Sequence, residues 1–180
     1  LKICQLNNWS TIGIEPDKGA RKIASTKGLV VKEELDLLDS KTYDIITLWH
    51  VLEHVIDLES YITQLRSKLK DDGVLIIAVP NFKSYDAQYY NKYWAAYDVP
   101  RHIWHFSRKA IHKIFKEHHM EVFSSKPMYF DAFYVSLLSE KYKTKKQNPL
   151  KAFRIGFRSN LLARRTHEYS SITYLLKKNI

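Results

Sequence analysis

The feature that most constrains the fold of this chain is a strand, helix, turn and strand pattern between residues 43 and 79. Residues 43–49 (YDIITLW) are rich in β-branched and aromatic side chains, which predicts a strand buried on both faces. From residue 58 apolar side chains recur every three or four positions, which predicts an amphipathic helix capped by Asp57. A turn at residues 70–73 and a second buried strand at 74–79 complete a βαβ unit with parallel strands.

Polar residues gather where the first of these strands ends. Trp49, His50, Glu53 and His54 follow within six positions. Ligands of open α/β sheets bind at the carboxyl ends of the strands, so these side chains are candidate site residues. His-x-x-Glu-His is also a zinc-peptidase signature, but that interpretation needs His50 inside a helix, and here it falls at a strand end.

The two segments "YDIITLWHVLEHV" and "LKDDGVLIIAVPN", with a helix between them, resemble class I S-adenosylmethionine-dependent methyltransferases. The likeness is to the small-molecule branch that includes the ubiquinone-biosynthesis O-methyltransferases, and it covers roughly residues 1–125. It implies an α/β, Rossmann-like three-layer sandwich with a mostly parallel sheet and an antiparallel last strand. It also implies the cofactor S-adenosyl-L-methionine and methyl transfer to a small-molecule or lipid-like acceptor, at oxygen.

On the cofactor side, residues 10–14 predict a strand that ends at Glu15, Pro16 and Asp17. An acid at this place can accept hydrogen bonds from both hydroxyls of a ribose, and Glu15 is the foremost candidate. The resemblance adds Pro16, Asp17, Trp49, His50 and Val51 to the cofactor site. A short helix at 18–26 and a strand at 29–31 are expected to follow.

The five glycines form no Gly-x-Gly, although a glycine-rich loop normally precedes such a strand and binds the cofactor. The interpretation is that the sequence begins inside the first helix, with the first strand missing. The alternative is a non-catalytic, Rossmann-like binding module. A nicotinamide-dependent oxidoreductase also uses a strand-end acid such as Glu15, but residues 49–54 disfavour it.

On the acceptor side, the aromatic-rich segment 82–106 predicts a lid or pocket wall above the strand ends. His102 is the first candidate for a general base and His105 the second, because an imidazole can accept a proton near neutral pH. Glu53 and His54 are placed at the rim of the acceptor pocket, with a catalytic or metal role and simple bracing of the helix start weighted about evenly. No metal is assigned, because His50 holds the position of an acidic ligand found in some ubiquinone-type relatives.

The net charge of +10 is confined to the end of the chain. Residues 1–140 carry 18 basic and 18 acidic side chains, whereas residues 141–180 carry 11 basic ones and a single acid, Glu168. The predicted organisation is therefore a methyltransferase core at 1–126, a basic helical insertion at 127–170 and the last core strand at 171–180. A balanced core argues against a general nucleic-acid binder, and Pro80-Asn81-Phe82 departs from the signature of amino-directed DNA methyltransferases.

Within the insertion, a helix at 131–143 and a polar linker at 143–147 precede a second helix that Asn148 caps. Leu150, Phe153, Phe157 and Leu161 form one apolar stripe on that helix, beside basic residues. A basic amphipathic helix at 149–165 suits peripheral contact with a membrane surface or an anionic substrate. The alternative is an ordinary helix folded over the pocket with its charges in water.

Composition adds two expectations. Cys4 is the only cysteine, which excludes an internal disulfide, and no apolar run approaches the roughly 20 residues of a membrane span. The chain is expected to be cytoplasmic. Its sequence leaves the methyl acceptor and the oligomeric state open.

Overall fold

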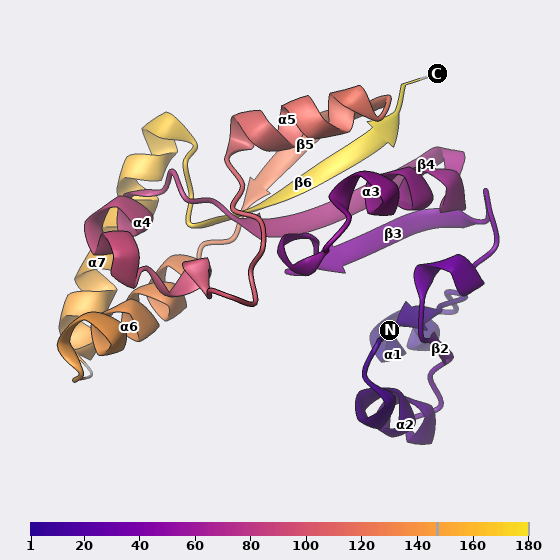
Figure 1. The fold of residues 1–180 in the computed structure, drawn as a ribbon, viewed down its shortest axis with the longest axis horizontal. Coiled ribbons are helices and arrows are strands. Elements are labelled where there is room, and N and C mark those ends of the chain that lie inside the picture. The colour runs from indigo at the N-terminus through magenta and orange to yellow at the C-terminus, as the bar shows by residue number, and fades with distance from the viewer. Residues whose placement is uncertain (147, 180) are drawn as a thin grey trace.

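The computed structural model describes residues 1–146 and 148–179, and its strands form two sheets (Figure 1). Gln147, in the predicted linker, and Ile180, in the predicted last-strand segment, lie outside the described residues. The smaller sheet pairs β1 (Gly13–Ile14) with β2 (Val31–Lys32) in parallel. The larger sheet has the order β3-β4-β6-β5, formed by β3 (Tyr43–Trp49), β4 (Leu69–Pro80), β5 (Met120–Pro127) and β6 (Ser171–Lys178).

The larger sheet has one strand of opposite direction. β3 and β4 are parallel, and β6 is antiparallel to both of its neighbours, β4 and β5. This arrangement confirms the predicted α/β, Rossmann-like class with an antiparallel last strand. That strand is Ser171–Lys178, within the predicted segment 171–180.

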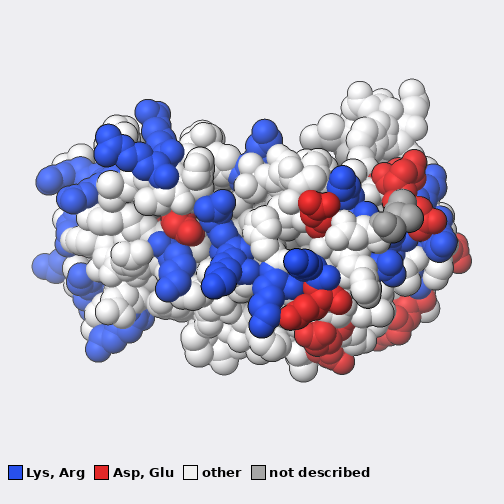
Figure 2. Space-filling view, turned by 90° about the horizontal axis from the view of Figure 1, so that it is seen from above, with Lys and Arg blue, Asp and Glu red and all other residues white. Residues whose placement is uncertain are grey.

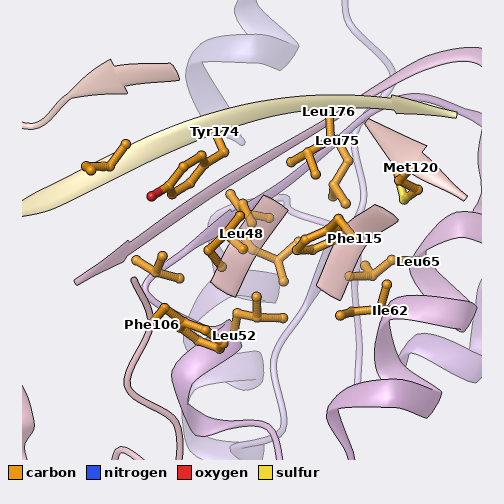
Figure 3. Packing of buried hydrophobic residues seen from close by; sticks show 14 of the residues in the cluster. Leu48, Leu52, Ile62, Leu65, Leu75, Phe106, Phe115, Met120, Tyr174 and Leu176 are labelled. Atoms are coloured by element: carbon orange, nitrogen blue, oxygen red, sulfur yellow. The ribbon is translucent and has the colours of Figure 1, made fainter. Parts of the chain in front are cut away.

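The main hydrophobic core lies between this sheet and two helices, α3 (Leu58–Lys68) and α5 (Arg108–Glu117), which lie over the same face (Figure 1). Asp57 caps α3 and Ser107 caps α5, as their sequences predict. Figure 3 shows the side chains of Leu48, Leu75 and Leu176 pointing toward Phe115 and Ile62 from the helices. Side chains that recur every 3.6 residues along each helix thus pack against side chains that recur every two residues along each strand, and together they form one core.

The prediction that β3 is buried on both faces was wrong. Leu48 is buried and Ile46 packs against the core, but Ile45 is 41% exposed and Trp49 is 54% exposed. Side chains alternate between the two faces of a strand, and the helices α3 and α5 cover only one of them. Apolar and polar residues do not alternate in this strand, so its sequence did not indicate that only one face is covered.

The predicted turn at residues 70–73 is part of strand β4. Tyr43 pairs with Leu69 and Ile45 pairs with Val74, so four residues of β4 bulge opposite a single residue of β3. The bulge is braced at Leu69, whose carbonyl accepts a hydrogen bond from the Lys178 ammonium group at 2.7 Å. The chain does bend at residues 70–73, as the predicted turn requires, but it continues afterwards in the same strand.

The N-terminal part is built from short elements. It contains α1 (Lys2–Leu6), α2 (Lys18–Thr26), β1, β2 and the 3₁₀ turn η1 (Leu35–Leu37). The strand predicted at 10–14 is only two residues long, Gly13–Ile14, and the one predicted at 29–31 is found at Val31–Lys32. A two-stranded ladder is marginal, and residues 10–12 line a hollow instead. That hollow, about 580 Å³ in volume, lies between these residues and the first residues of β3.

The remaining helices form a second unit, here called the helical lobe (Figure 1). It comprises α4 (Tyr85–Tyr90), the 3₁₀ turns η3 (Asn91–Tyr93) and η4 (Ala95–Tyr97), α6 (Asp131–Thr144) and α7 (Pro149–Thr166). Its own core includes Tyr90, Trp94, Val135 and Ile155. The predicted lid segment and the predicted insertion therefore share a single apolar core.

The carboxylate of Asp86 ties the helical lobe to the sheet. Asp86 is fully buried and accepts hydrogen bonds from the Trp94 indole N–H at 2.8 Å, the Ser159 hydroxyl at 2.6 Å and the Ser170 hydroxyl at 2.7 Å. These donors come from three segments: the turn after α4, helix α7 and the approach to β6. Nothing in the local sequence pattern indicates this junction.

Helix α7 packs through small residues. Ala152, Ile155, Gly156, Ser159 and Ala163 are buried, whereas the predicted apolar stripe at 150, 153, 157 and 161 lies on the surface. A Cβ atom added at Gly156 would lie 2.9 Å from the carbonyl oxygen of Ala132, which shows how closely α7 approaches α6. No helix in the described part of the chain is long and apolar enough to cross a membrane.

Candidate active site

The site is organised by the turn that ends β3. His50 has a φ of 53°, in the left-handed region that a residue other than glycine seldom adopts, and its N–H donates to the Ala78 carbonyl at 3.0 Å. The turn leads directly into the 3₁₀ turn η2 (Leu52–His54). It thereby places the His50 ring and the Glu53 carboxylate side by side.

His50 is held between two carboxylates. Its Nδ1 lies 3.0 Å from Oε1 of Glu53 and its Nε2 lies 3.2 Å from Oδ2 of Asp131, the first residue of α6. Because a carboxylate only accepts hydrogen bonds, both ring nitrogens donate, and the ring is an imidazolium. The bond to Asp131 and then that to Glu53 raise the pKa of His50 to about 9.

The loop that carries the other histidines is fixed on η2 by backbone bonds. The Glu53 carbonyl accepts from the N–H groups of Ile103 and Trp104, at 2.9 and 3.2 Å. The Trp104 indole N–H donates to the Val55 carbonyl at 2.7 Å. This pairing brings His102 against His54, with ring centroids 4.6 Å apart in an edge-to-face arrangement.

Both of these histidines meet a backbone carbonyl with Nδ1, and Nε2 of His102 lies 3.8 Å from Oδ2 of Asp98. Nδ1 of His54 lies 3.0 Å from the Arg101 carbonyl, and Nδ1 of His102 lies 2.8 Å from the Ala96 carbonyl. A carbonyl oxygen only accepts, so each Nδ1 carries the hydrogen and, in the neutral ring, Nε2 keeps its lone pair. Glu53, His54 and His102 each offer one ligand atom, and these atoms lie within 4.8 Å of one another.

The environment keeps His102 neutral. Burial lowers the pKa of His102 below its usual value of 6.5, while the Glu53 carboxylate opposes this by stabilising the protonated ring. Glu53 is 1% exposed, and its Oε2 has no hydrogen-bond partner among the described residues. A neutral imidazole beside an unsatisfied carboxylate can accept a proton, and the same three side chains could hold a divalent metal ion.

His105, the second candidate base, lies apart from this cluster. Its Nε2 is 3.0 Å from the Tyr97 carbonyl, and its ring packs on the ring of Tyr97 with centroids 5.0 Å apart. It is exposed, and it is not one of the three clustered ligand-bearing residues. Of the four side chains predicted for the acceptor side, the structure therefore brings together Glu53, His54 and His102.

The predicted cofactor residues lie at the carboxyl ends of two strands in different sheets. Glu15 follows β1 and is half-buried; its Oε1 accepts from the Asp17 N–H at 2.9 Å, and no described residue donates to its Oε2. Asp17 caps α2 by accepting from the Ala20 N–H. The Arg21 guanidinium holds the carbonyls of Glu15 and Pro16 at 2.8 and 2.6 Å, which fixes the backbone around the Glu15 carboxylate.

At the end of β3, Trp49 and Val51 are apolar and exposed, at 54% and 38%. Such surfaces suit the flat face of a nucleobase, and a free carboxylate oxygen suits ribose hydroxyls. His50, between them, is engaged in its two ion pairs. Glu15, Trp49 and Val51 thus have the chemistry that an adenosine-containing cofactor needs, whereas His50 is a structural element, and the cofactor assignment of these residues stays a prediction.

The fold is that of an α/β methyltransferase. The family model described as "Methyltransferase domain" matches residues 1–125, and the chain belongs to this family. This match confirms the predicted class of enzyme. A comparison with curated protein sequences gives no significant match.

Solved structures with the same fold have low sequence identity to this chain, and most of those compared are described as methyltransferases, although one is a [4+2]-cyclase. A possible histamine N-methyltransferase from Thermotoga maritima, described as S-adenosylmethionine-dependent, is 17% identical with a TM-score of 0.65, covering 94% of this chain and 73% of its own. Another such methyltransferase, from Archaeoglobus fulgidus, is 16% identical with a TM-score of 0.61, covering 98% and 80%. The 1,6-didemethyltoxoflavin-N1-methyltransferase of Burkholderia thailandensis, with S-adenosylhomocysteine bound, is 12% identical with a TM-score of 0.54, covering 94% and 61%.

Sequence reasoning missed Asp131 as a partner of the site. It lies 81 residues from His50 in the chain and was interpreted only as the start of a helix. Its one sequence signal, an acid in the first turn of α6, is also common in helices without any function. The particular likeness to ubiquinone-biosynthesis enzymes stays a prediction.

Proposed function

We propose that this protein transfers the methyl group of S-adenosyl-L-methionine to a hydroxyl oxygen of a small-molecule or lipid-like acceptor. The observation that carries the proposal is the convergence of Glu53, His54 and His102 at the carboxyl end of β3. The class of enzyme follows from the family. The acceptor atom is inferred from the presence of a neutral imidazole, because a hydroxyl must lose its proton as the methyl group is transferred.

On the cofactor side, Glu15 would accept hydrogen bonds from the ribose, and Trp49 and Val51 would contact the base. The bound cofactor supplies an electrophilic methyl group. Because that group needs no activation by the protein, the chain's own residues mainly position the acceptor.

On the acceptor side, Nε2 of His102 would take the hydroxyl proton, and the Glu53 carboxylate would stabilise the resulting imidazolium. His54 would contact the acceptor or the proton through its own Nε2. His50 keeps Glu53 in place through the bond between Nδ1 and Oε1. His102 is the preferred base because it is half-buried with Nδ1 fixed, whereas His54 is exposed.

The first test is calorimetric titration of S-adenosylhomocysteine into the full-length protein and its Glu15→Ala variant. Loss of the ribose contact should weaken binding by roughly tenfold or more, since hydrogen bonds to a charged group contribute about 1.5–3 kcal/mol. Asp36→Ala is a suitable control, because Asp36 lies in the exposed turn η1. Equal affinities for all three proteins would contradict the assignment of Glu15.

The second test is a panel of phenols, aliphatic alcohols and amines, with release of S-adenosylhomocysteine as the readout. With an active hydroxyl acceptor, His102→Gln should lower kcat/KM by roughly 10²- to 10⁴-fold, whereas His105→Gln should have little effect. The wild-type rate should fall as the pH drops below about 6.5 and be on a plateau at neutral pH, because burial lowers the pKa of His102.

The panel also separates the alternatives. If only amines are methylated, the proposed oxygen acceptor is wrong. This comparison is informative because two structural neighbours are named as N-methyltransferases. If a chelator abolishes activity and a divalent metal restores it, Glu53, His54 and His102 would be metal ligands, and His102 would not act as a general base. Cofactor binding without turnover of any acceptor would favour a binding module.

A further inference from the structure

The strongest unexplained feature outside the active site is the apolar stripe of α7, which comprises Leu150, Phe153, Phe157 and Leu161. These side chains are 81%, 61%, 56% and 49% exposed. Their spacing of three or four residues per turn places them on one face of the helix, opposite the small residues through which α7 packs. A soluble surface rarely presents such a continuous row of large apolar side chains without a partner.

The stripe is extended by aromatic residues of α6. Phe133 stacks on Phe153 with ring centroids 5.2 Å apart, and Phe153 stacks on Phe157 at 6.4 Å. Phe130, just before α6, is 85% exposed and Tyr134 is 65% exposed. The rings are therefore ordered against one another and yet accessible, so they could enter an apolar phase without rearrangement of the lobe.

Basic side chains border this apolar surface. Arg154, Arg158 and Arg165 are exposed and lie along α7 beside the stripe, and Lys145 and Lys146 lie just before the helix. In the part of the chain that the structure describes, Arg154 and Arg165 form no salt bridge, and the Arg158 guanidinium lies over the Tyr85 ring at 5.0 Å. Figure 2 shows Lys and Arg gathered toward the lobe end of the molecule and acidic residues toward the opposite end.

From these observations we infer that the helical lobe docks on the surface of an anionic lipid bilayer, with the stripe of α7 inserted among the headgroups and acyl chains. Exposed aromatic and aliphatic side chains on one face of a helix, with arginines beside them, are the features by which interfacial helices bind. Charge complementarity selects the occupant: residues 141–166, which run from the end of α6 through α7, have nine basic residues and no acid, which matches a negatively charged surface. A nucleic acid would use the arginines but would leave the phenylalanines in water.

The test is co-sedimentation of the full-length protein with two kinds of vesicle, one of phosphatidylcholine alone and one with part of it replaced by phosphatidylglycerol. Binding to the anionic vesicles only, weakened by added salt, is expected. The double variant Phe153→Ser, Phe157→Ser should lower the partition coefficient by about tenfold or more, since two aromatic rings would no longer be transferred from water to the bilayer. Arg154→Gln with Arg165→Gln should lower it by roughly tenfold at low salt.

Ile23→Ser is the matched control. Ile23 is 59% exposed on α2, outside the helical lobe, and its replacement should leave binding unchanged. Leu150→Ser is a further variant. Leu150 is 81% exposed and takes no part in the aromatic stacking of the lobe, so weaker binding of this variant cannot be attributed to loss of folding. Circular dichroism of each variant confirms its helix content.

The result that overturns the proposal is equally specific. Binding to anionic vesicles that is unaffected by the phenylalanine pair and by Leu150→Ser, or the absence of binding to either vesicle, excludes docking by the stripe. Competition by a short DNA duplex that the phenylalanine variant binds as well as the wild type would assign the basic surface to nucleic acid instead. None of these measurements involves methyl transfer, so the two proposals can fail independently.

Discussion

At the scale of single residues, His50 is the side chain whose charge depends most on the fold. Its ring is an imidazolium between Glu53 and Asp131, and these bonds raise its pKa from 6.5 to about 9. A group whose pKa is higher in the folded state stabilises that state fully below its unfolded pKa and loses the effect as the pH rises through the folded value. The stabilisation by His50 should therefore be complete below pH 6.5 and disappear above about pH 9.

The variant His50→Gln tests this. We expect urea unfolding to show the largest difference between the wild type and the variant at or below pH 6.5, and a shrinking difference as the pH approaches about 9. His118→Gln is the control, because His118 pairs with the exposed Glu59 at the surface. A difference that stays constant over this range, or grows with pH, would contradict the charged state assigned to His50.

The sequence indicated most of the site's residues but not their connections. His54, His102 and Glu53 were candidates because of their chemistry and their positions after predicted strands. The choice between His102 and His105 depends on which carbonyl each ring meets, Ala96 or Tyr97, and that is decided by the path of an irregular loop. The path of an irregular loop has no sequence period, so the difference between the half-buried His102, clustered with Glu53 and His54, and the exposed His105 became visible only in the structure.

At the scale of elements, Gly156 decides how α6 and α7 pack. Alanine normally stabilises a helix relative to glycine by about 1 kcal/mol. At this position the added Cβ would lie 2.9 Å from both the Ala132 carbonyl oxygen and Phe133 Cδ1, and backbone atoms cannot move aside without separating the helices. We therefore expect Gly156→Ala to reduce the free energy of unfolding by about 1–3 kcal/mol, by overpacking.

Thermal and urea unfolding measure this effect. Gly19→Ala in α2 is the matched control, because the added Cβ there meets no backbone atom within 4 Å and only one side-chain atom, Oδ1 of Asp17, at 3.1 Å. A glycine-to-alanine substitution at an open helix position stabilises the protein. If Gly156→Ala stabilises it by a similar amount, α6 and α7 do not pack as closely as described here.

The elements themselves were largely predictable. α2 and α7 begin where Asp17 and Asn148 supply caps, and α3 follows its apolar period from Asp57. The errors lie where tertiary structure overrides a local signal. Residues 70–73 bend as a turn should and yet remain in β4, and the apolar strand β3 is covered on one face only.

At the scale of the whole molecule, Asp86 joins the helical lobe to the sheet. Its carboxylate accepts hydrogen bonds from three buried or half-buried donors on segments up to 84 residues away. Asp86→Ala would leave the Trp94, Ser159 and Ser170 donors unsatisfied. We expect a loss of about 3 kcal/mol or more in the free energy of unfolding, because each of the three donors left without a partner costs about 1–3 kcal/mol.

Calorimetry and tryptophan fluorescence would detect this loss, the latter because Trp94 is 2% exposed. Asp86→Asn preserves the shape and should retain part of the stability, and Asp72→Ala at an exposed position is the control. Equal stability of Asp86→Ala and the wild type would show that the junction contributes nothing.

The position of β6 affects how the chain can be made. In the larger sheet it separates β4 from β5, although both precede it by more than forty residues. While a nascent chain emerges from the ribosome, β4 would present an open edge rich in apolar residues and β5 would have no strand to pair with until residues 171–178 appear. Synthesis of this protein should therefore depend on a chaperone that shields β4, and a chain terminated within the helical lobe should aggregate.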